Sequence, residues 1–120
     1  DGFRRRAVFG EPILQSEGVL ITRSGAPEPT GFSVFQRRLQ SVLVARTYVM
    51  MDYDIRLEDV ERAVELTPGI ESPTVSPLHR EGWAAVRAMV PRAATQRVMD
   101  DLYAVGARGI LVTDILSCRI

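Results

Sequence analysis

The stretch TYVMMDYDIRLEDVERAVEL, residues 47–66, decides the fold, because within it a strand pattern gives way to a helix pattern. Its first half, residues 47–55, is rich in apolar and β-forming side chains and predicts a strand. Its second half places Leu57, Val60 and Val64 on one helical face and its charged side chains opposite. The stretch therefore predicts a β-strand followed by an amphipathic helix.

The same two patterns return downstream. WAAVRAMV, residues 83–90, alternates as a strand that Pro91 closes. AATQRVMDDLYAVG, residues 93–106, carries apolar side chains at helical spacing and ends on Gly106, a residue suited to a helix C-cap. ARGILVTDILSC, residues 107–118, predicts a final buried strand.

TPGIESPTVSPLHREGW, residues 67–83, separates the two halves and contains three prolines. Pro68 cannot continue the preceding helix and Gly69 can take the left-handed position, so Thr67, Pro68 and Gly69 predict the helix end. SPTVSP predicts an extended strand at a sheet edge. From residue 47 the order is then βαββαβ, an α+β, ferredoxin-like fold with both helices on one face of an antiparallel sheet.

The upstream part predicts a strand near residues 17–23, a Pro/Gly loop at 26–31 and a linking helix at 32–48. The helix has one apolar stripe, made of Phe35, Leu39, Val42 and Leu43.

Apolar side chains also occur on both sides of the strand at 83–90. Val86, Ala88 and Val90 alternate with Trp83, Ala85 and Met89. A second sheet face this apolar indicates burial against another subunit.

The amino-acid composition limits the kinds of partner and site that this chain can have. The 15 arginines balance 15 acidic residues, so the chain lacks the positive field that dominates nucleic-acid affinity. No apolar run approaches the ~20 residues of a membrane span. Cys118 is the single cysteine, which excludes an internal disulfide and fits a reducing cytoplasm. Because His79 is the single histidine, a His/Cys metal cluster is excluded within one chain.

The residues alone indicate a binding or assembly module, because no Gly-rich phosphate loop is present. Asp54 is interpreted either as a helix N-cap or as a carboxylate that pairs with a ligand's ammonium group. Thr74 and Ser76 are edge-strand hydroxyls that could also bond a small polar ligand. Glu71 and Ser72 are expected to satisfy turn amides.

Several motifs together resemble one family. YVMMDYDI, LTPGIESPTVSPL, WAAVRAMVPR, VMDDLYAVGARGILVTDI and the terminal CR resemble the ACT-like regulatory domain of long-form ATP phosphoribosyltransferase, an enzyme of histidine biosynthesis. FGEPILQSEGVLI resembles the end of its catalytic region. The resemblance implies a catalytic-region strand segment at 1–25, a linker and connecting helix at 26–46, and the regulatory domain at 47–120.

The resemblance also implies chemistry. The family joins ATP to phosphoribosyl pyrophosphate with Mg²⁺ and releases pyrophosphate, and it assembles as a cytoplasmic hexamer with trimeric contacts through the regulatory domain. Its phosphoribosyl-pyrophosphate loop has no counterpart in this sequence. We therefore expect no catalytic residue and no metal site here, and no transferase activity from this chain alone.

The family's regulatory domain binds L-histidine between subunits. Carried over by motif, Asp54 meets the ligand's charged end, Ile70 and Thr74 line the pocket, and Met89 and Gly109 come from neighbouring strands. Two departures stand out. DYDIR lacks the Cys-Pro or similar pair often found after the aspartate, and Gly109 stands where the family often has alanine, which implies a larger or looser pocket.

Two other classes of function stay open. One is a free-standing ferredoxin-like oligomer that binds a small molecule, or a metal through one His79 per subunit of a trimer. The other is a structural module that only oligomerises, with Asp54 a cap and Thr74 a surface hydroxyl.

Overall fold

The computed structural model describes residue 11 and residues 13–120. Residues 1–10 and 12, part of the segment expected at 1–25, lie outside the described residues. The helices are α1 (Phe32–Thr47), α2 (Val60–Leu66) and α3 (Thr95–Ala104), and the strands are β1 (Tyr48–Arg56), β2 (Thr74–Pro77), β3 (Trp83–Pro91) and β4 (Arg108–Asp114). In this part of the chain, no helix has the length and apolar character needed to cross a bilayer.

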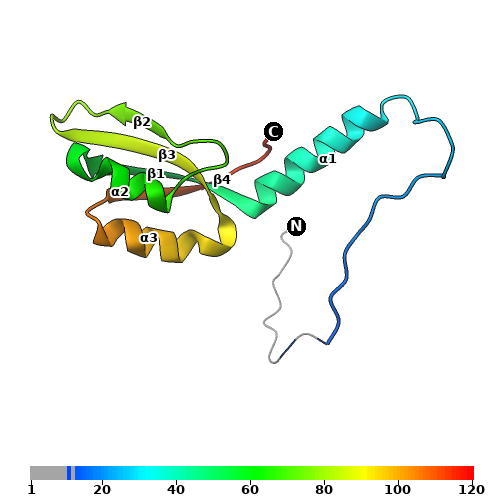
Figure 1. Ribbon diagram of the computed structural model, residues 1–120, viewed down its shortest axis with the longest axis horizontal. Helices are drawn as coiled ribbons and strands as arrows, with labels where there is room; N and C mark the ends of the chain where they lie inside the picture. The colour runs from blue at the N-terminus through cyan, green and yellow to red at the C-terminus, as the bar shows by residue number, and fades with distance from the viewer. Residues whose placement is uncertain (1–10, 12) are drawn as a thin grey trace.

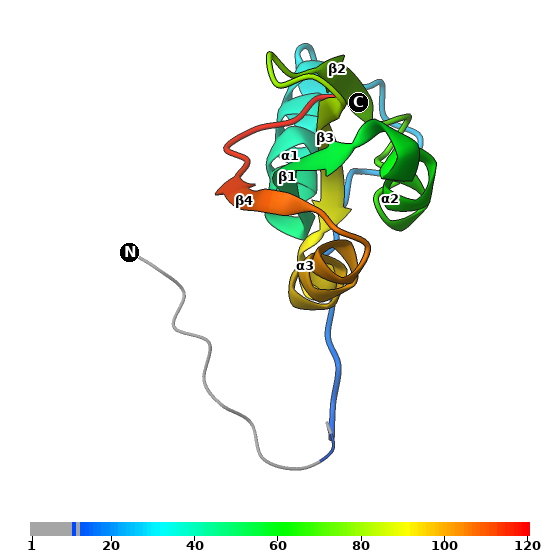
Figure 2. The same ribbon diagram turned by 90° about the vertical axis from the view of Figure 1, so that its left-hand side faces the viewer.

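The strands form an antiparallel sheet in the order β2-β3-β1-β4, with α2 and α3 on one face (Figures 1 and 2). A 3₁₀ turn, Leu57–Asp59, leads from β1 into α2, and a second, Arg92–Ala94, leads from β3 into α3. The predicted ferredoxin-like βαββαβ fold is confirmed, and β2 is an edge strand as predicted.

The core lies between the sheet and these two helices. Alternate side chains of β1 are buried, because a strand turns successive residues to opposite faces. The buried cluster includes Val49, Met51, Tyr53 and Ile55 of β1, Val86 and Val90 of β3, Ala63 of α2, and Val98 and Leu102 of α3. Each large apolar side chain buried here contributes about 1.5–3 kcal/mol to folding.

Strand β4 corrects one prediction. It was expected to be a buried strand, yet its residues are mostly exposed, and Leu111 keeps 62% of its surface. The reason is its place at the sheet edge, where it has one neighbouring strand and only the margin of the helical layer. Pairing position, rather than apolar content, decides its exposure.

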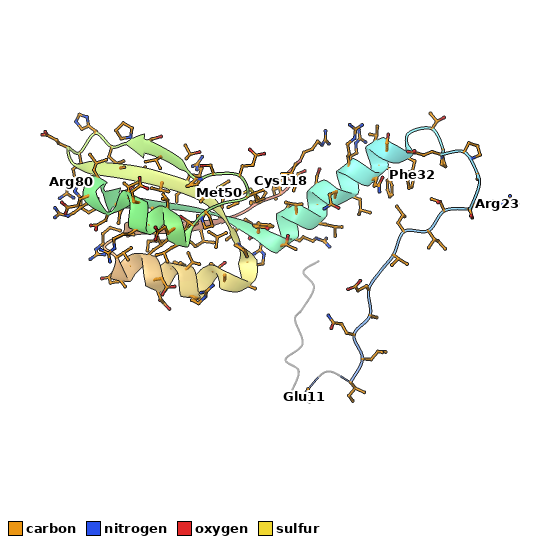
Figure 3. The ribbon with its side chains drawn as sticks, viewed as in Figure 1. Glu11, Arg23, Phe32, Met50, Arg80 and Cys118 are labelled. Carbon is orange, nitrogen blue, oxygen red and sulfur yellow. The ribbon has the colours of Figure 1, made fainter. Side chains whose placement is uncertain are left out.

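The strand predicted near residues 17–23 is not formed. This segment is extended but unpaired, and Figure 3 shows the chain between Glu11 and Arg23 running apart from the sheet. Val19 and Ile21 are 78% and 84% exposed. A strand needs a hydrogen-bonding neighbour, and this segment is no part of the sheet that the described residues form.

Helix α1 is confirmed, but its apolar stripe stays exposed. Phe35 is 53% exposed and Leu43 is 47% exposed, whereas the buried positions are Ser41, Val44 and Ala45. Only the end of α1 next to β1 packs against the domain, and the rest projects away from it (Figure 1).

A buried hydrogen bond ties β1 to the end of α2. The Tyr53 hydroxyl lies 2.8 Å from Thr67 Oγ1, and the Thr67 hydroxyl donates to the Ala63 carbonyl at 3.3 Å. Both side chains are 1% exposed. The sequence interpretation assigned Thr67 to the helix end only. Burial raises the pKa of the Tyr53 phenol above its ordinary value of 10.0, against the opposing effect of the Thr67 hydrogen bond.

We expect Tyr53→Phe to lower the free energy of unfolding at neutral pH by about 1 kcal/mol, the net worth of one hydrogen bond. The raised pKa means that the folded state holds its phenolic proton more tightly than the unfolded state. This stabilisation is present below pH 10 and is lost as the pH rises through the folded-state pKa. Urea unfolding at increasing pH should therefore show a gap between the two proteins that narrows above pH 10.

Tyr103→Phe is the matched control, because the Tyr103 side chain is 62% exposed. It should leave the stability of the chain unchanged at neutral pH. A constant gap between Tyr53→Phe and the unaltered chain across the alkaline range would contradict the role given to the buried phenol.

Candidate functional site

The sheet face opposite α2 and α3, called here the open face, has a mixed surface. In its register Met50 pairs with Met89, Asp52 with Arg87 and Asp54 with Ala85. The open face also includes Tyr48 and Arg56 of β1, Thr74 and Ser76 of β2, Trp83 and Pro91 of β3, and Leu111 and Thr113 of β4. Trp83, Ala85 and Met89 are half-buried on this side, so the predicted second apolar row exists.

A charged pair that the sequence interpretation missed interrupts the apolar surface. Arg87 Nε donates to Asp52 Oδ1 at 2.6 Å. Because the two side chains are 63% and 29% exposed, the pair contributes at most about 1 kcal/mol. Its main effect is to place polar groups in the middle of the open face.

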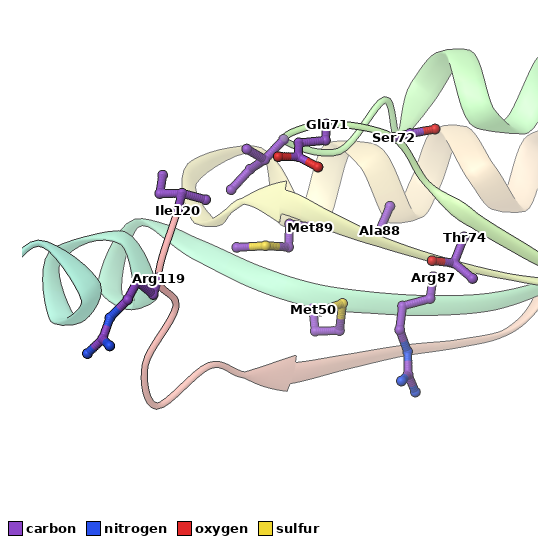
Figure 4. A pocket seen from close by; sticks show the side chains of 10 residues that line it. Met50, Glu71, Ser72, Thr74, Arg87, Ala88, Met89, Arg119 and Ile120 are labelled. Carbon is purple, nitrogen blue, oxygen red and sulfur yellow. The ribbon is translucent and has the colours of Figure 1, made fainter. Parts of the chain in front are cut away.

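A cavity of about 310 Å³ lies beside this pair (Figure 4). Its lining residues are Met50, Ala88 and Met89 of the sheet, Ile70, Glu71, Ser72, Thr74 and Arg87 around them, and Arg119 and Ile120 from the end of the chain. We call it the methionine pocket. Three of the predicted site residues, Ile70, Thr74 and Met89, therefore lie in one pocket.

The loop after α2 shapes this pocket. Gly69 has φ +71°, which reverses the chain directly after the helix, as predicted. A Cβ on Gly69 would lie 3.4 Å from the carbonyl carbon of Ser72, an ordinary contact distance, so the positive φ and not a lack of space favours glycine here. The loop carries Ile70 and Glu71 to the pocket, and Figure 4 shows the Glu71 side chain on the same side of the pocket as Met89.

Asp54 lies within β1, and its interpretation as a helix cap is wrong. The strand continues to Arg56, which precedes the 3₁₀ turn, and Asp59 precedes α2; neither start has a side-chain cap. Asp54 instead sits half-buried on the open face.

Gly109 lies next to Asp54 at a β-bulge. Asp52 pairs with Leu111 and Asp54 with Arg108, so two steps along β1 face three along β4. Gly109 takes the positive φ of +59° that such a bulge requires, and a Cβ there would lie 3.6 Å from Asp54 Oδ2.

The five predicted site residues thus form two groups on one face. Ile70, Thr74 and Met89 line the methionine pocket, whereas Asp54 of β1 and Gly109 of β4 lie side by side on neighbouring strands and line no part of it. Their roles in binding stay predictions. Sequence reasoning missed Arg119 and Ile120, because nothing in the local pattern shows where the chain returns after β4.

The part of the chain that the structure describes offers few ligands for a metal ion. No group of three His, Cys, Asp or Glu side chains there is placed to hold a metal ion. His79 is exposed in the turn between β2 and β3.

The fold and its open face define a class, a ferredoxin-like α+β domain of the ACT-like type. Residues 45–117 match the family model described as "HisG, C-terminal domain", and the chain belongs to this family. The resemblance stated from the motifs is confirmed.

Proteins of similar sequence support the same family assignment. The chain is 66% identical over 117 residues to the ATP phosphoribosyltransferase of Streptomyces coelicolor, 64% over 117 residues to that of Streptomyces avermitilis, and 61% over 113 residues to that of Kocuria rhizophila. Each match covers 94% of this chain but only 40–41% of the relative. The chain therefore spans about two fifths of the length of these relatives.

We expect Gly109→Ala to lower the free energy of unfolding by about 1–2 kcal/mol, because an L-residue is strained in the left-handed region. A steric clash does not cause this loss of stability, because the new Cβ would lie at an ordinary contact distance of 3.6 Å from Asp54 Oδ2. Thermal or urea unfolding measures the change.

Gly18→Ala is the matched control, because Gly18 has open space around it and no positive φ. It should leave stability unchanged. Equal stability of Gly109→Ala and the unaltered chain would mean that the bulge at β4 relaxes without cost.

Proposed function

We propose that this chain is the regulatory and oligomerisation part of an ATP phosphoribosyltransferase, and that it binds L-histidine as a feedback inhibitor. Phosphoribosyl transfer from phosphoribosyl pyrophosphate to ATP, with Mg²⁺, would belong to the longer part of the relatives that this chain does not match. The chain alone would be inactive. The whole enzyme would act in the cytoplasm as a hexamer.

The methionine pocket supports a small-molecule ligand. Its volume of about 310 Å³ is at the lower end of the range for ligand pockets. Its floor is apolar, with Met50 and Met89, and its rim carries the Thr74 hydroxyl and the Glu71 carboxylate. An amino acid, with a compact body and several polar groups, has matching chemistry. The two prolines of SPTVSP restrict the loop beforehand, which lowers the entropy lost on binding.

The observation that carries the proposal is the division of the predicted residues into two groups on the open face. No aspartate is among the residues that line the methionine pocket, and Asp54 lies outside it. A second copy of the chain, packed against this face, would bring its Asp54 toward the first copy's pocket. The carboxylate would then accept hydrogen bonds from the ligand's ammonium group.

A shared pocket also explains regulation. A ligand shifts an equilibrium only by the difference in its affinity for the two states. Rotation of one subunit against the next would separate Asp54 from the pocket. Histidine would therefore stabilise the subunit arrangement in which the two groups meet.

We expect calorimetry with this chain to show saturable L-histidine binding, and mass determination in the same buffer to show an oligomer. Asp54→Ala should weaken the binding about 30-fold or more, because removing one partner of a buried, hydrogen-bonded charge pair costs about 2–5 kcal/mol. The oligomeric mass should be unchanged.

Glu58→Ala is the control, since Glu58 is an exposed carboxylate in the 3₁₀ turn between β1 and α2. It should bind L-histidine like the unaltered chain. A folded oligomer that binds no L-histidine, or an Asp54→Ala variant that binds it equally well, would overturn the proposal.

A further inference from the structure

The last residues of the chain connect two regions that are far apart in sequence. After β4 the chain turns back toward the end of α1, as the red segment in Figures 1 and 2 shows. The Cys118 amide donates to the Ser41 carbonyl at 3.1 Å, and Cys118 Sγ lies 4.0 Å from Met89 Sδ. Cys118 therefore contacts both α1 and the floor of the methionine pocket.

The α1 side of this contact is well held. Ser41 is 2% exposed, and its hydroxyl donates to the Arg37 carbonyl at 2.8 Å. The neighbouring buried residues, Val44 and Ala45, attach the same end of α1 to the domain. Cys118 is thus hydrogen-bonded to the part of α1 that packs against the domain.

The two residues that follow Cys118 lie along the methionine pocket. Arg119 and Ile120 line the methionine pocket, and Figure 4 shows Ile120 across the pocket from Thr74, near Met89 and Glu71. Ile120 is nevertheless 71% exposed. An apolar side chain that faces an apolar floor across a hollow would lose water contact when a ligand fills the hollow.

We propose that residues 118–120 form a wall of the ligand pocket, with Ile120 contacting the bound ligand and Cys118 as a positioning residue. This inference rests on the proposed function. Because the same residues contact α1, a ligand that holds this wall also holds the end of α1. Occupancy of the pocket is thereby linked to the helix that joins the domain to the preceding chain.

The wall can respond to a ligand because its last two residues, Arg119 and Ile120, are exposed. Within the described structure, Cys118 makes one backbone hydrogen bond, to Ser41, and one sulfur contact, to Met89. Segments held by few buried contacts open at low free energy. A ligand that binds only the closed arrangement suppresses opening in proportion to its saturation.

Cys118 provides the first test, because a maleimide can label the chain at no other thiol. We expect L-histidine at 100 times its dissociation constant to slow labelling by about 10- to 100-fold, as closure predicts. Asp54→Ala at the same L-histidine concentration should show much weaker protection, which separates ligand binding from a solvent effect of the amino acid.

Ile120→Ala provides the second test, with Leu116→Ala as its matched control. Both changes remove a large apolar side chain from the same segment, but Leu116 is 92% exposed and lines no part of the pocket. Ile120→Ala should raise the dissociation constant for L-histidine about tenfold, since a ligand that covers Ile120 takes part of its apolar surface out of water. Leu116→Ala should leave the dissociation constant unchanged.

The outcomes separate the two proposals. If calorimetry shows bound L-histidine but the ligand does not slow Cys118 labelling, the wall is overturned and the histidine site stands. The same conclusion follows if Ile120→Ala binds L-histidine as tightly as Leu116→Ala does. If the unaltered chain binds no L-histidine, both proposals fall. Protection of Cys118 together with weaker binding by Ile120→Ala alone supports the wall.

Discussion

Strand β1 is hydrogen-bonded along both edges, to β3 and to β4, and the rest of the domain depends on this constraint. Its nine residues pair along their whole length with β3, so the side-chain alternation of the two strands is locked together. A slip of one residue would turn Met51, Tyr53 and Ile55 away from the helices. The same register places Asp52 opposite Arg87 and Met50 opposite Met89 on the open face.

One face of the sheet carries the groups that stabilise the fold, and the other face carries the candidate binding groups. The helical face holds the apolar core and the Tyr53–Thr67 hydrogen bond, and none of the described buried side-chain polar atoms lacks a partner. The open face instead carries an exposed ion pair, a pocket with a methionine floor and an aspartate beside a bulge. Its polar groups fit a ligand or a second subunit better than they fit a continuous core.

Backbone geometry places the candidate groups at least as much as side-chain packing does. Gly69 reverses the chain so that its loop reaches the methionine pocket, and Gly109 provides the bulge beside Asp54. Both glycines have positive φ, a conformation that other residues adopt at a cost. The segment after β4 then returns to α1, so that the pocket borders a helix outside the βαββαβ unit.

The sequence by itself determined the element order from residue 32 onward, the helix end at Pro68 and Gly69, the edge position of SPTVSP, and the family. These features follow from local rules of periodicity and backbone chemistry, and from motifs that are long enough to be specific. Tertiary structure alone decided that Asp54 lies inside a strand rather than at a cap, that β4 is exposed, and that residues 17–23 stay unpaired. It also decided that Arg119 and Ile120 reach the pocket. The physical reason is that exposure and strand pairing depend on which distant segments become neighbours in the fold. The local sequence pattern does not show which segments these are.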